Sequence, residues 1–225
     1  MAKKSMEGIN MTFFANFNKS AKELKSVRCL AVTAIFIALD LVLKTVTITV
    51  STNLKISFAF LALASIGMLY GPTVSLLAGI VTDVIGFFTI PQSGGFNPMF
   101  TVVEAMGAMI YGMFLYNIKF SDAQTRNGKF AVKSDIKQLL RIVLAKVTVI
   151  VVCNLILTPI ALIVTNSMEA GTFVYAPTLA KYPARLLKNL IQCPVDCALL
   201  LAVLPIISGA YNRVFKPRTV SFGKE

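Results

Sequence analysis

Three basic residues and an amide stand close together in the run 181–189, near the start of a long apolar stretch. Arg185, Lys188 and Asn189 are spaced i, i+3, i+4, so they share one face of a helix. An Arg side chain can hold a carboxylate through two parallel hydrogen bonds. The spacing therefore predicts a site for an anionic ligand. Pairing of these cations with Glu104 or with lipid phosphates is the alternative.

Aromatic residues occur in segments that we expect at the same level of the molecule. Together they could enclose a flat heterocycle, although each taken singly is typical of ordinary packing or lipid-facing surface. Lys55 is expected on the same side as the cations. The residues that we assign to the site besides the cationic run are Lys55, Phe58, Phe60, Phe96, Phe100 and Tyr182.

The composition indicates a membrane protein. Of the 225 residues 56% are hydrophobic and only 14% are charged, whereas about a quarter are charged in a soluble domain. Histidine is absent, which removes the commonest metal ligand and the commonest general base. We expect no catalytic residue, no metal and no cofactor.

The apolar stretches predict an all-α integral membrane protein with six transmembrane helices, since a helical span needs about 20 apolar residues. The chain is expected to form a single membrane domain, with a cytoplasmic segment at 1–27, a bundle at 28–212 and a cytoplasmic tail at 213–225. The predicted helices are 29–50, 56–70, 73–90, 99–118, 139–164 and 179–211.

The basic residues predict the orientation. The N-terminal segment holds six Lys and Arg, the connection between the fourth and fifth helices six, and the C-terminus four, which is 16 of the 22. Six helices place these three regions on one side, and the positive-inside rule makes that side cytoplasmic. The rule also accounts for the net charge of +12, so no nucleic-acid partner is expected.

Ionisable residues inside the apolar stretches are costly in lipid and each needs a partner or a function. Asp40 and Lys44, at i, i+4, are expected to pair. Lys146 is expected to extend towards the cytoplasmic interface. Asp83 and Asp196 are expected to pair with basic groups of other helices.

Small residues are spaced for close helix contacts. Ala31, Ala34 and Ala38 form a stripe along the first predicted helix, and Gly67 and Gly71 stand four apart at the end of the second. Small residues at this spacing allow helices in membranes to approach closely. The stripe is a candidate interface for a partner helix.

Three stretches, 54–60, 67–83 and 182–189, carry a resemblance to a known family. The sequence resembles the S components of energy-coupling factor (ECF) transporters, most closely the folate type, over about residues 28–212. The resemblance implies a high-affinity vitamin-binding subunit of a bacterial cell membrane, with no catalytic activity of its own. It implies a transmembrane (T) subunit and two ATPases as partners.

The resemblance also assigns roles to residues. It implies that Ala34 and Ala38, together with Ala31, dock the T subunit, and that the link at about 47–56 acts as a gate. Folate fits the residues chemically, because its pterin ring suits an aromatic slot and its glutamate carboxylates suit Arg and Lys.

Other functions stay open from the sequence. The ligand could be another vitamin, such as thiamine, riboflavin or a queuosine precursor. An enzyme acting on lipid or isoprenoid phosphates is a more distant alternative, because the acidic residues are scattered over the predicted helices and histidine is absent. A purely structural membrane subunit would not need a cluster of cations on the outer side.

Overall fold

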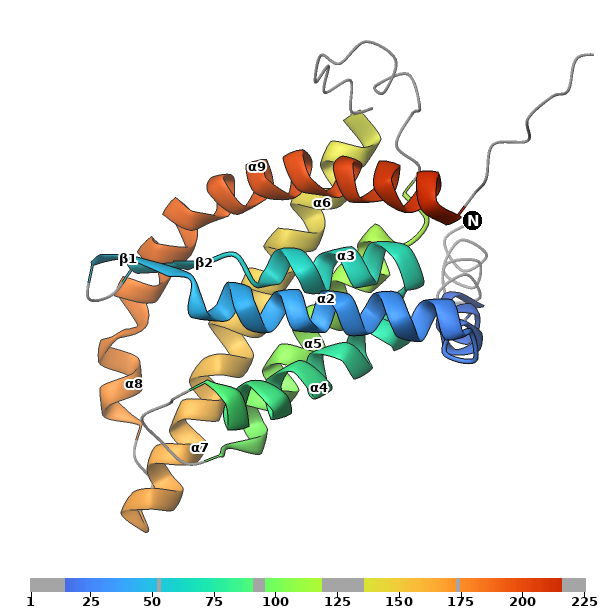
Figure 1. Cartoon of the computed structure of the whole chain (residues 1–225). Coiled ribbons are helices and arrows are strands. Elements are labelled where there is room, and N and C mark those ends of the chain that lie inside the picture. Colours follow the sequence, from blue (N-terminus) through green and yellow to red (C-terminus); the bar gives the residue numbers. More distant parts are fainter. Residues whose placement is uncertain (1–14, 52–53, 91–95, 119–135, 173–174, 216–225) are drawn as a thin grey trace, which may run out of the picture.

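The computed structural model describes residues 15–51, 54–90, 96–118, 136–172 and 175–215 (Figure 1). The chain begins with a short helix, Ala15–Glu23, which is followed by the labelled elements. These are α2 Val27–Thr45, β1 Thr47–Ser51, β2 Leu54–Ser57, α3 Phe60–Tyr70, α4 Pro72–Thr89, α5 Pro98–Leu115, α6 Ile136–Val149, η2 Ile150–Leu157, α7 Thr158–Ala170, α8 Ala176–Ala180 and α9 Tyr182–Phe215.

Within the described residues, four helices are long and apolar enough to cross a membrane: Pro72–Thr89, Pro98–Leu115, Ile136–Met168 and Tyr182–Phe215. They correspond to four of the predicted helices. The helix Ala15–Glu23 and α2 qualify as a fifth span only together, across a bend of 90°. The chain is thus a multi-pass helical membrane protein.

A β-hairpin connects the first two predicted helices, where the sequence analysis expected the ends of those helices. α2 ends at Thr45, and β1 pairs antiparallel with β2, with Ile48 opposite Ile56. The run 47–51 alternates Thr, Ile, Thr, Val and Ser, and β-branched residues at a period of two favour a strand. The predicted end of helix at residue 50 was therefore wrong, and so was the predicted start at residue 56.

The second predicted helix is consequently short. α3 has 11 residues, which at 1.5 Å per residue is about 16 Å, or half of a bilayer core. Gly71, with φ of +87°, makes the turn into α4, a conformation that glycine adopts without steric cost.

The fifth predicted helix is longer than the sequence indicated, and the sixth begins at Tyr182 instead of 179 and ends at Phe215 instead of 211. α6, η2 and α7 form one helix with a π-helical middle, and α7 ends before Gly171, which is left-handed. The fifth predicted helix, 139–164, therefore ends six residues too early. α9 has 34 residues with two internal prolines, and it curves across one side of the bundle (Figure 1).

Glycines bring α3, α4 and α5 into close contact. A Cβ atom on Gly67 would lie 2.6 Å from the backbone N of Gly112, and one on Gly112 would lie 2.6 Å from the Cα of Pro72. The spacing at Gly67 thus does mark a close helix approach, with α5 as the partner. These three helices form a fixed core beside which α6 and α9 pack.

The interior charges are paired, though not all as predicted. Lys44 lies 3.1 Å from Asp40, which confirms that pair, and Asp196 does pair with another helix, 2.7 Å from Lys146. Lys146 is buried, so its predicted extension to the interface is wrong. Asp83 accepts a hydrogen bond of 2.6 Å from the hydroxyl of Thr101, and it takes part in none of the ion pairs between described residues.

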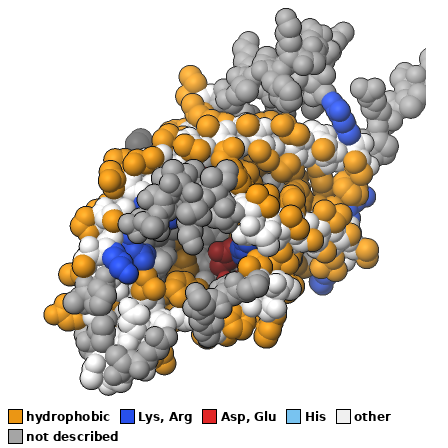
Figure 2. Space-filling model, turned by 60° about the vertical axis from the view of Figure 1, so that its left-hand side comes forward, with side chains coloured by type: hydrophobic (Ala, Val, Ile, Leu, Met, Phe, Trp, Pro, Cys, Tyr) orange, Lys and Arg blue, Asp and Glu red, His pale blue; other side chains and the backbone are white. Residues whose placement is uncertain are grey.

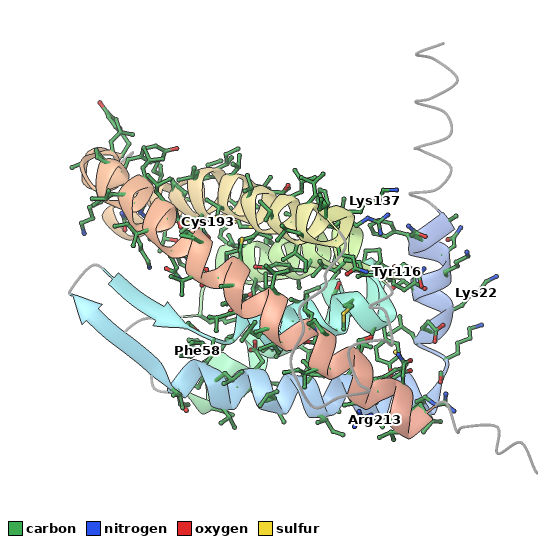
Figure 3. All side chains as sticks on the ribbon, turned by 90° about the horizontal axis from the view of Figure 1, so that it is seen from above. Lys22, Phe58, Tyr116, Lys137, Cys193 and Arg213 are labelled. Atoms are coloured by element: carbon green, nitrogen blue, oxygen red, sulfur yellow. The ribbon has the colours of Figure 1, made fainter. Side chains whose placement is uncertain are left out.

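The two ends of the bundle differ. Figure 3 shows Lys22, Lys137 and Arg213 at one end, where α2 and α6 begin and α9 ends. The hairpin, α8 and the first turns of α9 lie at the other end (Figure 1).

Candidate functional site

A cavity of about 650 Å³ lies beside the first turns of α9, a size within the range of about 300–1,000 Å³ usual for small-molecule sites. Its walls come from α9, the π-helix η2 with the start of α7, the end of α8 and the end of β2. The described lining residues are Ser57, Asn154, Thr158, Ala180, Lys181, Ala184, Arg185, Lys188, Asn189 and Gln192.

Helical periodicity explains why α9 presents polar groups to this cavity. Arg185, Lys188 and Gln192 follow one another at intervals of three or four residues, and all are half-buried. The apolar residues between them, such as Leu187 and Leu190, are exposed on the other side of the helix. An amphipathic segment inside a membrane thus directs its cations inward and its leucines to lipid.

Proline and the π-helical segment fix the opposite wall. Pro159 has no N–H to donate to the carbonyl of Leu155, and the hydroxyl of Tyr182 donates to that carbonyl at 3.2 Å. Asn154, in the π-helical segment, donates to the side-chain oxygen of Asn189 at 3.0 Å. Two side-chain contacts therefore tie the start of α9 to η2. π-Helical turns are frequent at functional sites.

The structure brings together part of the predicted site. Arg185, Lys188 and Asn189 line the cavity. Tyr182 supports it through its hydroxyl instead of lining it. The aromatic residues Phe58, Phe60, Phe96 and Phe100 are not among the described lining residues.

The aromatic residues have other contacts. Phe60 stacks on Tyr111 with ring centroids 6.5 Å apart, and the ammonium of Lys146 lies 4.2 Å from the centre of the Phe60 ring. Phe96 packs edge-on against Phe87. Lys55 lies in β2 opposite Thr49, and its side chain is outside the described residues. The described residues therefore form no aromatic slot at the cavity.

Sequence reasoning missed four polar lining residues. Gln192 continues the i, i+4 series from Lys188, so extending the same periodicity by one turn would have found it. Asn154 is a polar residue inside an apolar stretch, which is a signal in its own right. Thr158 and Ser57 carried no such signal, because hydroxyl residues are common in helices and loops alike.

The cavity wall on α9 is cationic, and the predicted alternative partner is engaged elsewhere. Glu104 lies 3.0 Å from Lys44, and none of the three ion pairs between described residues involves Arg185. In the described part of the chain, no group of three His, Cys, Asp or Glu side chains is placed to hold a metal ion. The described residues of this cavity thus suit an anionic organic ligand rather than a metal.

Figure 2 looks onto this end of the molecule. Basic side chains gather on one side of a hollow, and acidic and basic side chains are visible together inside it. The surface around them is mostly hydrophobic, as expected where a polar site is surrounded by lipid-facing helices.

A second candidate surface lies on α2. Ala31, Ala34 and Ala38 are all exposed, whereas Cys29 and Val32 on the other side of the helix are buried. The alanine stripe therefore faces away from the bundle. A flat exposed stripe of small residues leaves space for the close approach of another helix.

Known proteins resemble this chain along most of its length. Residues 24–202 match the family described as "ECF-type riboflavin transporter, S component". The folate transporter FolT of Leuconostoc mesenteroides is 30% identical over 185 residues, which cover 81% of this chain and 88% of that protein. FolT of Clostridium novyi is 34% identical over 98 residues, and the matched part spans 44% of this chain and 56% of that relative.

A solved structure agrees with these relatives. It is described as "Crystal structure of FolT bound with folic acid", and it superimposes with a TM-score of 0.61 at 28% identity, covering 80% of this chain and 95% of that one. The family match covers more than half of the chain, and the Leuconostoc relative is matched over most of its length. This chain therefore belongs to the family of S components, the substrate-binding membrane subunits of ECF-type transporters.

Proposed function

We propose that this S component binds folate at the cavity beside α9. The observation that carries the proposal is the cationic wall formed by Lys181, Arg185 and Lys188. The glutamate tail of folate carries two carboxylates, whereas riboflavin is neutral and thiamine is a cation. A cluster of three cations favours the dianionic vitamin, and the relatives named as folate transporters agree with that choice.

The roles of the lining residues follow from their chemistry. Arg185 offers a planar fork of donors for one carboxylate, and Lys188 offers a point charge for the other. Asn154, Asn189 and Gln192 provide amide donors and acceptors that hydrogen-bond the rest of the ligand.

We also propose how the protein is oriented in the bacterial cell membrane. The end with Lys22, Lys137 and Arg213 faces the cytoplasm by the positive-inside rule, so the cavity end faces outside. Six crossings put both termini in the cytoplasm, with the hairpin beginning the crossing that the short α3 completes. Vitamin is captured from outside, and a T subunit with two ATPases drives its release inside. The exposed alanines of α2 are the docking surface for the T subunit.

The test is ligand binding by the purified chain in detergent. Folic acid, riboflavin and thiamine are titrated separately in a calorimeter. Folate-specific binding at a stoichiometry of about one, as expected for one ligand in the cavity beside α9, is the expected result. Preference for riboflavin or thiamine, or absence of binding by all three, would refute the proposal.

A further inference from the structure

A second cavity lies at the basic end of the bundle, opposite the cavity beside α9. Its volume is about 390 Å³, and it lies between the residues that follow α5 and the first two turns of α6. Figure 3 shows Lys137 at this end, together with Lys22 and Arg213. The described lining residues are Asn117, Ile118, Lys137, Gln138, Leu140 and Arg141.

The ends of two helices build this cavity. α5 ends at Leu115, and Asn117 has a φ of +60°, the left-handed conformation with which Gly or Asn often terminates a helix. On the other side, Lys137 and Arg141 are spaced i, i+4 and share one face of α6. Two cations and an amide are thereby brought to one place.

The cations of this second cavity are suited to an anion. Lys137 and Arg141 are both exposed, and none of the three ion pairs between described residues involves either of them. Like charges at i, i+4 repel each other, and an anion held between them removes that repulsion. Arg supplies a planar fork of donors for a phosphate and Lys supplies a point charge.

An exposed apolar stripe continues from these cations along α6. Leu140, Leu144 and Val147 are spaced i, i+4, i+7 and are 42–56% exposed. The continuous helix from Ile136 to Met168 has 33 residues, or about 50 Å at 1.5 Å per residue, whereas the hydrocarbon core is about 30 Å thick. Its charged first turns therefore lie at the level of the lipid headgroups, and the stripe enters the hydrocarbon.

The two features together match one kind of molecule. A free phosphate would use the cations alone, and a neutral lipid would use the apolar stripe alone. A phospholipid with net negative charge uses both, because its phosphate lies beside the cations while an acyl chain lies along the helix. Basic pockets at the membrane surface favour such lipids.

We propose that this second cavity binds the headgroup of an anionic phospholipid of the phosphatidylglycerol type, with an acyl chain along the stripe of α6. Lys137 and Arg141 hold the phosphate, and the side-chain amides of Asn117 and Gln138 hydrogen-bond the hydroxyls of the headgroup. The ammonium of a zwitterionic headgroup would approach the two cations, so the site selects against phosphatidylcholine. In the proposed orientation of the protein, the bound lipid belongs to the inner leaflet.

The experiment is a lipid titration of the purified full chain in detergent, followed by native mass spectrometry. One phosphatidylglycerol per chain is expected to bind at least about tenfold more tightly than phosphatidylcholine. Lys137→Gln combined with Arg141→Gln should weaken phosphatidylglycerol by about tenfold or more and should abolish the preference. Lys22→Gln combined with Arg213→Gln is the matched control, because it removes the same charge from the same end outside the cavity lining. It should change the affinity by less than about twofold.

Two soluble probes distinguish a lipid from a free anion. Inorganic phosphate and glycerophosphoglycerol, the headgroup without acyl chains, should not raise the melting temperature at concentrations where phosphatidylglycerol does. A rise with either probe that disappears in the double variant of Lys137 and Arg141 would replace the lipid with a soluble anion and overturn the proposal.

The lipid titration can also contradict the proposal. Equal losses in the two double variants would show a general attraction to the basic end, and equal affinity of the wild type for both lipids would exclude a headgroup site. Arg141→Gln, with Arg213→Gln as its control, serves if the double variant does not purify as folded protein. Folate affinity should be the same in all these variants, so this result is independent of the proposed function.

Discussion

Arg185 stands on the first turn of α9, half-buried at the cavity, and takes part in none of the three ion pairs described. Truncating one partner of a buried charge-assisted contact costs about 2–5 kcal/mol. We therefore expect Arg185→Ala to weaken folate binding by tens-fold or more, since about 1.4 kcal/mol is tenfold. Arg185→Lys should restore only part of the affinity, because the ammonium of Lys cannot form the two parallel hydrogen bonds that the guanidinium of Arg forms with a carboxylate.

The measurement for Arg185 is calorimetric titration of folate and of a bare pterin. Pterin has no carboxylates, so its weak binding should hardly change. Leu186→Ala, at the neighbouring exposed position, is the control for disturbance of α9. Losses of equal size for folate and pterin would mean that Arg185 does not hold the carboxylates.

The buried pair Lys146–Asp196 makes a prediction about stability. The two side chains are 2.7 Å apart and both are buried, and Lys146 also lies over Phe60. Removing one member leaves the other uncompensated, which costs about 3–5 kcal/mol in proteins, whereas replacing both with apolar residues is often neutral. Lys146→Met should lower the melting temperature in detergent sharply, and adding Asp196→Leu should restore most of it. A double variant as unstable as the single one would contradict this explanation.

The helices α3, α4 and α5 are held together by backbone contacts that leave no space for side chains. Gly112→Ala would place a Cβ atom 2.6 Å from the Cα of Pro72 and 2.5 Å from the Oγ of Ser75. Overpacking typically costs about 1–3 kcal/mol, so the melting temperature should fall. Gly209→Ala is the matched control, because a Cβ atom there meets nothing within 4 Å. A melting temperature unchanged in both variants would show that α5 can shift to accept the methyl group.

Substitutions on the exposed face of α2 are expected to reduce transport without reducing ligand binding. Ala34→Trp or Ala38→Trp adds bulk where two helices are proposed to touch, so vitamin uptake with the complete transporter should fall sharply. Folate binding by the isolated subunit should stay near normal, because this face points away from the bundle. Leu190→Trp, on an exposed part of α9, is the control for bulk facing lipid. Normal uptake in both alanine variants would exclude the stripe as the docking surface.

The whole molecule has a basic end and a cavity end, and the orientation across the membrane can be tested directly. A cysteine at Lys22, on the exposed short helix, should resist an impermeant thiol reagent in intact cells. A cysteine at Leu179, exposed at the cavity end, should react. The wild-type chain, with its four native cysteines, is the control. The reverse pattern would turn the cavity towards the cytoplasm and refute capture from outside.

Local features of the sequence determined the membrane class, four long helices and the cationic run on α9. These follow from interactions between residues close in the chain, such as the i, i+3, i+4 spacing of Arg185, Lys188 and Asn189. The cavity wall on α9 could be predicted for this reason. Its far wall could not, because Asn154 and Ser57 are brought to it by packing between distant segments.

Tertiary structure alone decided which charges meet. From the sequence, Lys146 was equally able to reach the membrane interface, and only the crossing of α6 and α9 places it against Asp196. Likewise Glu104 pairs with Lys44, 60 positions earlier in the chain, rather than with the cations of α9. The strands 47–51 and 54–57 form a hairpin because they pair with each other, although the alternation of β-branched residues in 47–51 already favours a strand. Electrostatic partners and strand pairs depend on contacts in space, which the periodicity of a single segment does not contain.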